Sequence, residues 1–395
     1  MHLNKEYRYE MSVEVRYNNN RIFIDSTHIK SLAIERNYEA KNMPVVLLSM
    51  TVDKNIADYI INNKDIGRIY LVIFKYVINT EFPIKEVYLE EEFIYFLTQN
   101  TNKTKEIDYG GEDNNKDKDY TTPLLIGLVK QQLIDSNKQN IMNEIFVNAR
   151  VIDMICKYSS NRKLLIEPPN PDVIDKLVVT PITTYTEYIK FLDDKINLYK
   201  DSYYRLFYDF DKTYILSGKG IATYAKGEKK YPIVINILNN INMDSKMEGL
   251  LVEDDKYILN VDESVISEGK NNSSNLVYNN IIGINSDGTK ASTNITSDRA
   301  SSLLSKTYIQ RYNTDNSNNN KSLKSTIENR EKSINIIKHN IDSSILSLNK
   351  EFIVKYEDKD DEYTGNYILV NKKEIFSREE EHFCITIVIT LAKVK

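Results

Sequence analysis

Residues 164–217 read LLIEPPNPDVIDKLVVTPITTYTEYIKFLDDKINLYKDSYYRLFYDFDKTYILS and contain the clearest succession of structural signals in the chain. The prolines at 168, 169 and 171 fix an extended or turn backbone and stop any helix. The β-branched run Leu177–Thr180 then predicts a short strand. Thr184 followed by Glu187 fits a capping box, and apolar residues recur behind it at three and four positions. A helix is therefore expected over residues 184–200.

The segment Tyr203–Phe210, directly after this helix, is aromatic or apolar on both faces. A strand with two apolar faces normally lies in an interior, covered by another layer or by a subunit. Asp209–Lys212 then provides a turn, because aspartate side chains bond their own backbone. We expect this region to be a structural joint or interface, formed by Tyr204, Phe207, Tyr208, Asp209, Phe210 and Asp211.

The first part of the chain is rich in strand signals. Tyr7–Tyr17 alternates between apolar and charged side chains, which is typical of a half-buried strand. Further strands are expected at 21–24, 29–36, 45–52, 68–77, 85–89 and 92–97, with a short helix at 54–62. Residues 1–98 therefore predict a first small β-barrel domain.

Residues 99–122 contain almost nothing to bury and predict a solvated linker. The following residues, 123–203, predict a mixed middle domain that ends in the joint described above. Within it, Pro123–Ile134 fits a strand or a short helix. The apolar spacing in Ile141–Tyr158 predicts an amphipathic helix.

The last third of the chain returns to strand signals, at 221–224, 231–238, 256–261, 352–356, 363–371 and 383–391. Residues 204–263 and 345–395 therefore predict a second β-barrel domain. Between them, residues 264–344 are expected to form a peripheral insertion; its first part is rich in Ser, Asn, Thr and Asp, and Ser322–Leu348 has a partly helical pattern. The predicted fold class is α+β, mainly β: two small tube-forming barrels, a mixed middle domain and an outward insertion.

The composition excludes some functions. The 395 residues include 52 basic and 57 acidic ones, a net charge of −5, which argues against a general nucleic-acid binder. The first ten residues lack the apolar core of a signal peptide, and no apolar run reaches the ~20 residues that span a bilayer. Cys156 and Cys384 both lie in apolar patterns, so buried reduced thiols are expected.

No catalytic signature is present. Asp209-Phe210-Asp211 is a DxD, a motif that can hold a divalent cation, but Asp also favours turns, and the turn is the preferred interpretation. The four histidines show no metal-ligand spacing. Ser217–Gly220 fits a hairpin turn better than a phosphate loop, and there is no G-x-S-x-G. We therefore expect no catalytic, cofactor-binding or metal-binding residues and no cofactor.

The order of elements in the central stretch resembles the baseplate hub proteins of contractile-tailed bacteriophages and related injection machines. The matching features are Leu164–Ile166 with its prolines, Val178-Val179-Thr180-Pro181, the helix with Phe191-Leu192-Asp193, the region of Tyr199, and Phe207–Leu216. The small residue that usually follows the helix is absent, because Lys200-Asp201-Ser202 stands in its place.

The resemblance implies a homotrimeric ring with two tube-forming domains per chain. Such a ring joins the sixfold tail tube protein to the threefold central spike protein, contacts baseplate wedge proteins and lets DNA pass without specific binding. It implies a place in the virion tail baseplate after assembly in the host cytoplasm. Two alternatives stay open: a tail-tip or fibre-attachment adhesin that binds a cell-surface glycan, and a metal enzyme using Asp209 and Asp211.

Overall fold

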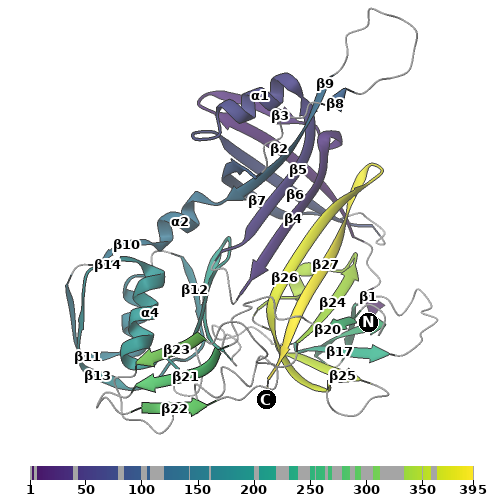
Figure 1. Cartoon of the computed structure of the whole chain (residues 1–395). Coiled ribbons are helices and arrows are strands. Elements are labelled where there is room, and N and C mark those ends of the chain that lie inside the picture. The colour runs from purple at the N-terminus through teal and green to yellow at the C-terminus, as the bar shows by residue number, and fades with distance from the viewer. Residues whose placement is uncertain are drawn as a thin grey trace, which may run out of the picture.

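The structure is a computed structural model. It describes residues 2–3, 7–38, 43–78, 84–98, 105–106, 120–141, 143–159, 162–199, 204–218, 231–238, 250–253, 255–262, 266–268, 278–284, 290–294, 306–311, 333–348, 350–356 and 363–394. The expected strand at 221–224 lies outside these residues, as do most of the expected linker and most of the polar part of the insertion. Figure 1 shows a barrel at the top, a second strand-rich body at its lower end, and a smaller mixed unit beside them.

The barrel is a closed ring of eight strands. Each strand is hydrogen-bonded to the next, and the last returns to the first through the pair Tyr9–Phe383. In ring order the strands are β2 (Tyr7–Tyr17), β6 (Arg68–Val77), β7 (Ile84–Leu97), β9 (Tyr120–Val129), β5 (Val45–Asp53), β4 (Ile29–Asn37), β26 (Gly365–Glu379) and β27 (His382–Lys393). Closure removes the free strand edges that an open sheet would expose.

Alternation along the strands explains the barrel's interior. In β5 every second side chain is buried, and β6 and β27 follow the same two-residue period. Helix α1 (Lys54–Asn62) packs with Ala57 and Ile60 inward, and the short strand β3 (Asn20–Ile24) extends β2 as a hairpin. A two-residue strand, β8 (Lys105–Glu106), pairs with the start of β9.

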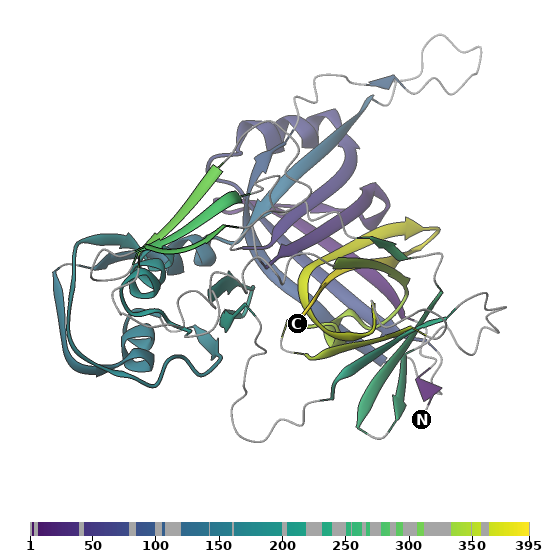
Figure 2. The same cartoon turned by 60° about the horizontal axis from the view of Figure 1, so that its bottom comes forward.

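The second body is a curved sheet that shares β26 and β27 with the barrel (Figure 2). Over the described residues it is open at both ends. Its other strands are β1 (His2–Leu3), β18 (Leu250–Glu253), β19 (Lys256–Asp262), β17 (Ile233–Leu238), β25 (Phe352–Tyr356), β24 (Ser333–His339) and β20 (Ile266–Glu268).

The change of partner along β26 occurs at a bulge. Residues Gly365–Tyr367 pair with β25, and residues from Asn371 onward pair with β4. Between them, the register of β26 against β27 shifts around Val370. A bulge bends a strand and increases its twist, so one hairpin can serve two bodies with different orientations.

The mixed unit is built on small sheets around helix α4 (Tyr185–Ile196). Helix α2 (Gln131–Asn137) links it to β9. Its other elements are β10 (Lys138–Ile141), β11 (Glu144–Arg150), α3 (Val151–Lys157), β12 (Lys163–Ile166), β13 (Val173–Val179), β14 (Ile182–Thr184), β15 (Tyr204–Tyr208) and β16 (Lys212–Ser217). A separate three-stranded sheet of β21 (Tyr278–Ile284), β22 (Lys290–Asn294) and β23 (Lys306–Arg311) lies with β23 against α4 (Figure 1).

The mainly β class is confirmed, but several expected boundaries are wrong. Tyr120–Val129, expected at the end of the linker and in the middle domain, is a barrel strand, and so is the C-terminal hairpin. The barrel is therefore not made by residues 1–98 alone. The hairpin β15–β16, expected in the second barrel, pairs with β12 in the mixed unit. Strands β20 and β24, expected in the insertion, belong to the second body.

Three local expectations also fail. The helical pattern in 322–348 is a strand at Ser333–His339, because β27 offers a complete hydrogen-bonding partner. Ile141–Tyr158 divides into β11 and the short helix α3. Helix α4 ends at Ile196 because Asn197 adopts a left-handed conformation, with φ of 53°.

Both cysteines are free, as expected, but Cys156 is exposed and Cys384 is only partly buried.

Candidate functional site: the joint between the aromatic hairpin and the barrel

The capping box at the start of α4 forms as expected. The backbone N–H of Glu187 donates to Thr184 Oγ1 at 3.1 Å, and Thr183 Oγ1 donates to the Glu187 carboxylate at 3.1 Å. The hydroxyls of Tyr185 and Tyr188 then donate to the carbonyls of Ile155 and Met154, at 2.8 and 2.9 Å. These bonds satisfy the last carbonyls of α3, so the two helices are fixed against each other.

The hairpin β15–β16 is buried on both faces, as the sequence predicted for Tyr203–Phe210. Its turn is closed by the N–H of Asp209, which donates to the carbonyl of Lys212 at 2.8 Å. Arg162 holds the turn from the side: it donates to the carbonyls of Asp209 and Phe210, and to that of Lys212 at 3.0 Å. Burial lowers the pKa of Arg162, but the three carbonyl bonds keep the guanidinium tied to this turn.

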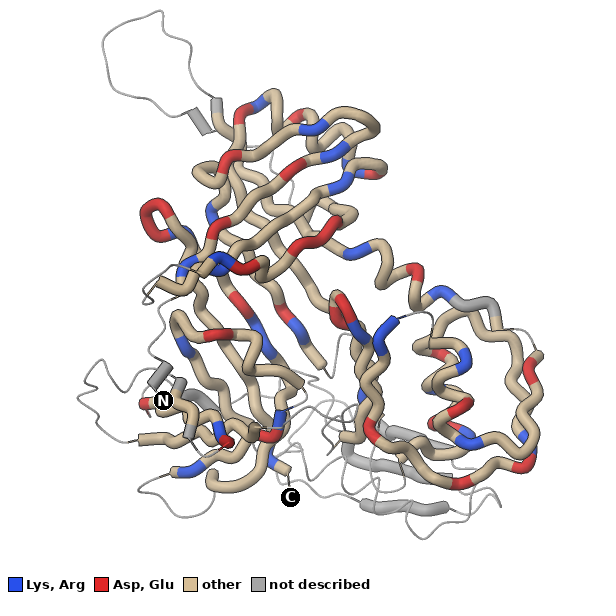
Figure 3. The backbone as a smooth tube through the Cα atoms, turned by 180° about the vertical axis from the view of Figure 1, so that it is seen from behind, with Lys and Arg blue, Asp and Glu red and all other residues tan. Residues whose placement is uncertain are grey.

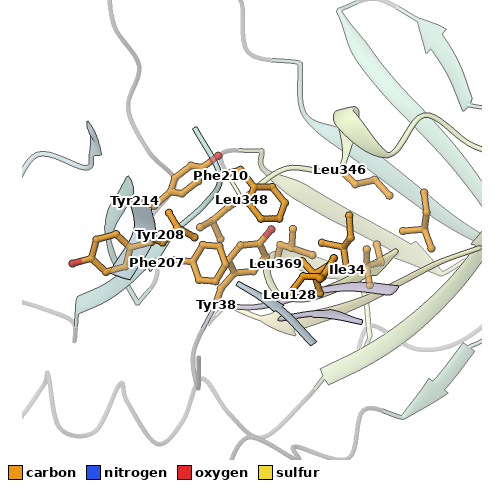
Figure 4. Packing of buried hydrophobic residues seen from close by; sticks show 14 of the residues in the cluster. Ile34, Tyr38, Leu128, Phe207, Tyr208, Phe210, Tyr214, Leu346, Leu348 and Leu369 are labelled. Atoms are coloured by element: carbon orange, nitrogen blue, oxygen red, sulfur yellow. The ribbon is translucent and has the colours of Figure 1, made fainter. Parts of the chain in front are cut away.

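The aromatic side chains of the hairpin pack in one cluster with barrel residues, among them Ile34 and Leu128 (Figure 4). The ring of Phe207 packs edge-on against the ring of Tyr38, with a centroid separation of 4.7 Å. The ring of Phe210 packs edge-on against Phe93 of β7, with a centroid separation of 5.8 Å. Phe207 and Phe210 are only 1% and 6% exposed. Edge-on aromatic pairs stabilise beyond the area they bury, so these two contacts anchor the mixed unit to the barrel.

A buried ion network stands beside the aromatic contacts. Arg36, at the end of β4, donates from Nε to Asp209 Oδ1 at 3.0 Å and from Nη1 to Glu374 Oε2 at 2.5 Å. Burial alone would lower the pKa of Arg36, but the two carboxylates hold it well above its ordinary value. One guanidinium therefore links the hairpin tip to two barrel strands, β4 and β26.

Glu374 is the centre of this network. Its carboxylate accepts from Tyr88 Oη at 2.5 Å and from Ser343 Oγ, and Lys372 Nζ lies 3.2 Å away. Burial favours the protonated acid, yet Lys372 and Arg36 together hold the pKa of Glu374 far below its ordinary range. The carboxylate is therefore charged, and both of its oxygens are bonded, Oε2 to Arg36 and Oε1 to the other three groups.

Arg205 ties the hairpin to the bulge of β26. It is 4% exposed, and it donates to the carbonyl of Ser217 at 3.2 Å and to that of Leu369 at 3.3 Å. The next carbonyl, of Val370, accepts from the N–H of Tyr38 at 3.0 Å. Both carbonyls freed by the bulge thus find donors, one of them from the mixed unit.

The six residues singled out from the sequence divide into two groups. Phe207, Asp209 and Phe210 meet at the barrel, as described above. Tyr208 is buried but donates to Asn137 of α2 at 3.0 Å, and Tyr204 is partly buried at the other end of β15. Asp211 lies apart, with 66% of its side chain exposed and Lys212 Nζ 3.5 Å from its carboxylate.

The two aspartates of the DxD therefore do not converge on one point. Over the described parts of the chain, no group of three His, Cys, Asp or Glu side chains could hold a metal ion. Likewise, none of the described helices is long and apolar enough to cross a membrane.

Sequence reasoning missed Arg36, Arg205, Lys372 and Glu374. Arg36 gave no signal, because its partner Asp209 is 173 positions away. Lys372 and Glu374 did give a sequence signal. Together with Phe376 they occupy every second position of one strand, so two charged residues lie on its inward face. Charges on an inward face indicate a buried ion pair.

Comparisons with known proteins agree with a phage origin. The chain from residue 3 to residue 394 matches the model of the family described as Bacteriophage PBS1 gene 109 protein. No curated protein matches the sequence.

Several solved structures are similar. The tail protein from Neisseria meningitidis MC58 has 10% identity and a TM-score of 0.47, with 97% of each chain covered. The 43 kDa tail protein of prophage MuSo2 from Shewanella oneidensis has 10% identity and a TM-score of 0.49, covering 97% of this chain and 96% of that one. A chain of the Francisella PdpA-VgrG complex has 12% identity and a TM-score of 0.45, and the match covers 98% of this chain and 53% of that one. Since the family model matches almost every residue, the chain belongs to the family of the Bacteriophage PBS1 gene 109 protein.

Proposed function

We propose that this chain is a structural baseplate hub protein of a phage tail or a related contractile injection machine. Three copies form a ring that joins the tail tube protein to the central spike protein and lines the DNA conduit. The ring also contacts baseplate wedge proteins, is assembled in the host cytoplasm and remains in the virion. Its role is assembly and not catalysis.

The observation that carries this proposal is the shared hairpin β26–β27. One chain builds two strand-rich bodies on it, the closed barrel and the second curved sheet. In a homotrimer three chains therefore present six such bodies. A ring of this kind can match a sixfold tube on one side and a threefold spike on the other, as the resemblance to baseplate hubs implies.

The joint supports the same role. A ring subunit that bears load needs a fixed angle between its parts. The Arg36–Asp209 and Arg36–Glu374 bonds are directional and buried, and buried polar contacts can specify one arrangement where apolar packing would tolerate several. We infer that the joint holds the mixed unit outward from the ring.

The barrel wall supports contact with another protein. Across β26, β4, β5, β9 and β7 the cross-strand pairs align an uncharged row on the outer face: Ile375, Ala33, Leu47, Gly127 and Phe96. The Phe96 ring lies directly over Gly127, where a Cβ would come within 2.2 Å of it. An uncharged row of this kind suits the barrel-to-barrel contacts of a ring.

The charge balance suits a conduit. The chain carries a net charge of −5, and a negative wall does not retain DNA phosphates.

The test is the mass and shape of the purified protein. We expect a species of three times the chain mass of 46.0 kDa in native mass spectrometry, and a ring in negative-stain images. A chain that stays monomeric at ~100 µM, well above the micromolar affinities of weak interfaces, would overturn the proposal. Monomers that bind a glycan array would instead favour the adhesin.

A further inference from the structure

Residues 340–348, between β24 and β25, belong to the second body but lie against the barrel. We call them the linking loop. The loop leaves β24 where the backbone N–H of Asn340 donates to the carbonyl of Ile385 on β27, at 2.9 Å. It contains the short 3-10 helix η3 (Ser343–Ile345). Ser343 and Leu346 are fully or almost fully buried, although they lie outside any strand. Something in the barrel therefore holds this loop in place.

The barrel presents three buried charges at the end that faces the loop. Lys75 near the end of β6, and Lys372 and Glu374 near the start of the barrel part of β26, alternate with the outward side chains of their strands. All three are more than nine-tenths buried. The end of β6 and the start of β26 share one rim, because the strands of the ring are antiparallel. Figure 3 shows basic and acidic residues on neighbouring strands in this lower part of the barrel.

The linking loop is bonded to both of these strands. Asp342 Oδ2 accepts from Lys75 Nζ of β6 at 3.2 Å, and the carbonyl of Ser343 accepts from Lys372 Nζ of β26 at 2.6 Å. The hydroxyl of Ser343 also donates to Glu374. In the ring, β6 and β26 are separated by β2 and β27, so the loop crosses this end of the barrel.

The same glutamate is bonded to the mixed unit through its other oxygen. Glu374 Oε1 accepts from Ser343, whereas Oε2 accepts from Arg36 Nη1 at 2.5 Å. Arg36 in turn donates to Asp209 at the hairpin tip, at 3.0 Å. Asp209 of the mixed unit and Ser343 of the second body are thus connected through two intermediate side chains.

Apolar packing follows the same route. Leu346 and Leu348 of the linking loop belong to one buried cluster with Phe207 and Phe210 of the hairpin (Figure 4). Interiors packed at this density transmit a displacement to their neighbours and do not absorb it. The loop therefore responds to the hairpin through both polar and apolar contacts.

We propose that Glu374 and the linking loop form a relay that couples the position of the mixed-unit hairpin to the second body. When the hairpin tip moves, Arg36 moves with Asp209, and Glu374 must then change its bonds to Ser343 and Lys372. The effect is reciprocal, because a coupling free energy between two sites acts in both directions. The relay lies inside one chain and does not depend on the proposed ring. In a subunit whose mixed unit faces outward, it passes a force on that unit to the strands of the second body.

Hydrogen exchange of the full chain tests the relay from the hairpin side. The amide of Leu346, which donates to the carbonyl of Ser343 at 3.1 Å, reports on the linking loop. In Asp209→Ala we expect the loop amides to exchange about tenfold faster than in the wild type, because their local opening becomes easier. Asp211→Ala should leave them unchanged. Loop exchange at the wild-type rate in Asp209→Ala would overturn the proposal.

A second control separates the relay from a general loss of stability. Ile60 is fully buried in α1, at the opposite end of the barrel (Figure 1). Ile60→Ala should destabilise the chain and accelerate exchange in α1, but not in the linking loop. Equal acceleration of the loop in Ile60→Ala and Asp209→Ala would mean that the loop follows global stability, and the relay would be refuted.

A double-mutant cycle gives an independent readout. Asp209→Ala and Ser343→Ala each weaken the same chain of bonds from opposite ends. The loss of urea midpoint in the double variant should therefore be smaller than the sum of the two single losses. Asp211→Ala combined with Ser343→Ala should be additive. Additive losses in the first pair would refute the relay and leave the ring proposal standing, since the cycle does not measure assembly.

Discussion

Arg36 and Asp209, 173 positions apart in sequence, are joined by a 3.0 Å bond between Nε and Oδ1. Their side chains are 12% and 15% exposed, so the pair is largely shielded from water. It connects β4 of the barrel to the tip of the β15–β16 hairpin. The orientation of the mixed unit therefore depends on a charge pair as well as on aromatic packing.

The first prediction concerns Asp209. In Asp209→Ala the guanidinium of Arg36 keeps Glu374 but loses one of its two carboxylates, so the unfolding free energy should fall by about 2 kcal/mol. Urea denaturation followed by tyrosine fluorescence measures this. Asp211→Ala is the matched control, because its exposed side chain should matter by less than ~0.5 kcal/mol. Equal losses in both variants would remove the special role of Asp209.

Removal of the central carboxylate should cost more. Glu374→Gln leaves Arg36 with only Asp209 and leaves Lys372 buried without its partner, and a loss of about 3–5 kcal/mol is expected. Because the folded-state pKa of Glu374 is depressed, its contribution is present above the unfolded value of ~4.3 and is lost as pH falls towards the folded pKa. The difference from the wild type, measured by urea denaturation at pH 7, 5 and 3, should therefore shrink at pH 3. A difference that stays constant down to pH 3 would contradict this.

Asp193, near the C-terminus of α4, should give stability the opposite pH dependence to Glu374. Burial raises its pKa to about 7, although the N–H of Leu198 donates to its carboxylate at 3.1 Å. A raised folded pKa gives stability that is complete below the unfolded value and is lost as pH rises through 7. Asp193→Asn should therefore raise the melting temperature at pH 8.5 and leave it nearly unchanged at pH 5. Asp58→Asn, at an exposed position of helix α1, is the control, and an equal gain there would contradict the assignment to Asp193.

The aromatic anchors provide the fourth prediction. Phe207→Ala and Phe210→Ala should each lower the unfolding free energy by about 3–5 kcal/mol, because each leaves a cavity between the hairpin and the barrel. Phe23→Ala, at a side chain 70% exposed, should change it by less than ~0.5 kcal/mol. Chemical denaturation of all three variants checks this. A loss below ~1 kcal/mol at Phe207 would mean that the joint can close around the gap.

Local signals in the sequence predicted local structure well. The bounds of β2, β6, β25 and α1 follow directly from alternation or helical spacing, and the Thr184 cap forms as its motif indicates. The turn at Asp209 likewise depends only on residues close to it in the sequence. These features are decided within about ten residues of chain.

Pairing between distant segments could not be predicted in the same way. Nothing in Tyr120–Val129 shows that its partners are β5 and β7 and not the middle unit. Whether 333–339 is strand or helix depends on β27, which supplies seven paired positions. The ion network brings together residues from β4, β26 and the hairpin tip, and no sequence period connects them.

The hairpin β26–β27 also has a consequence for biosynthesis. The barrel begun by Tyr9 is closed by Phe383, so its last two strands leave the ribosome long after the first. Until then β4 and β2 expose backbone groups along unpaired edges, next to apolar side chains that other nascent chains can bind. Expression with chaperones, or at low temperature, should therefore increase the yield of folded protein. A chain shortened before residue 365 should precipitate during synthesis and not accumulate as a stable fragment.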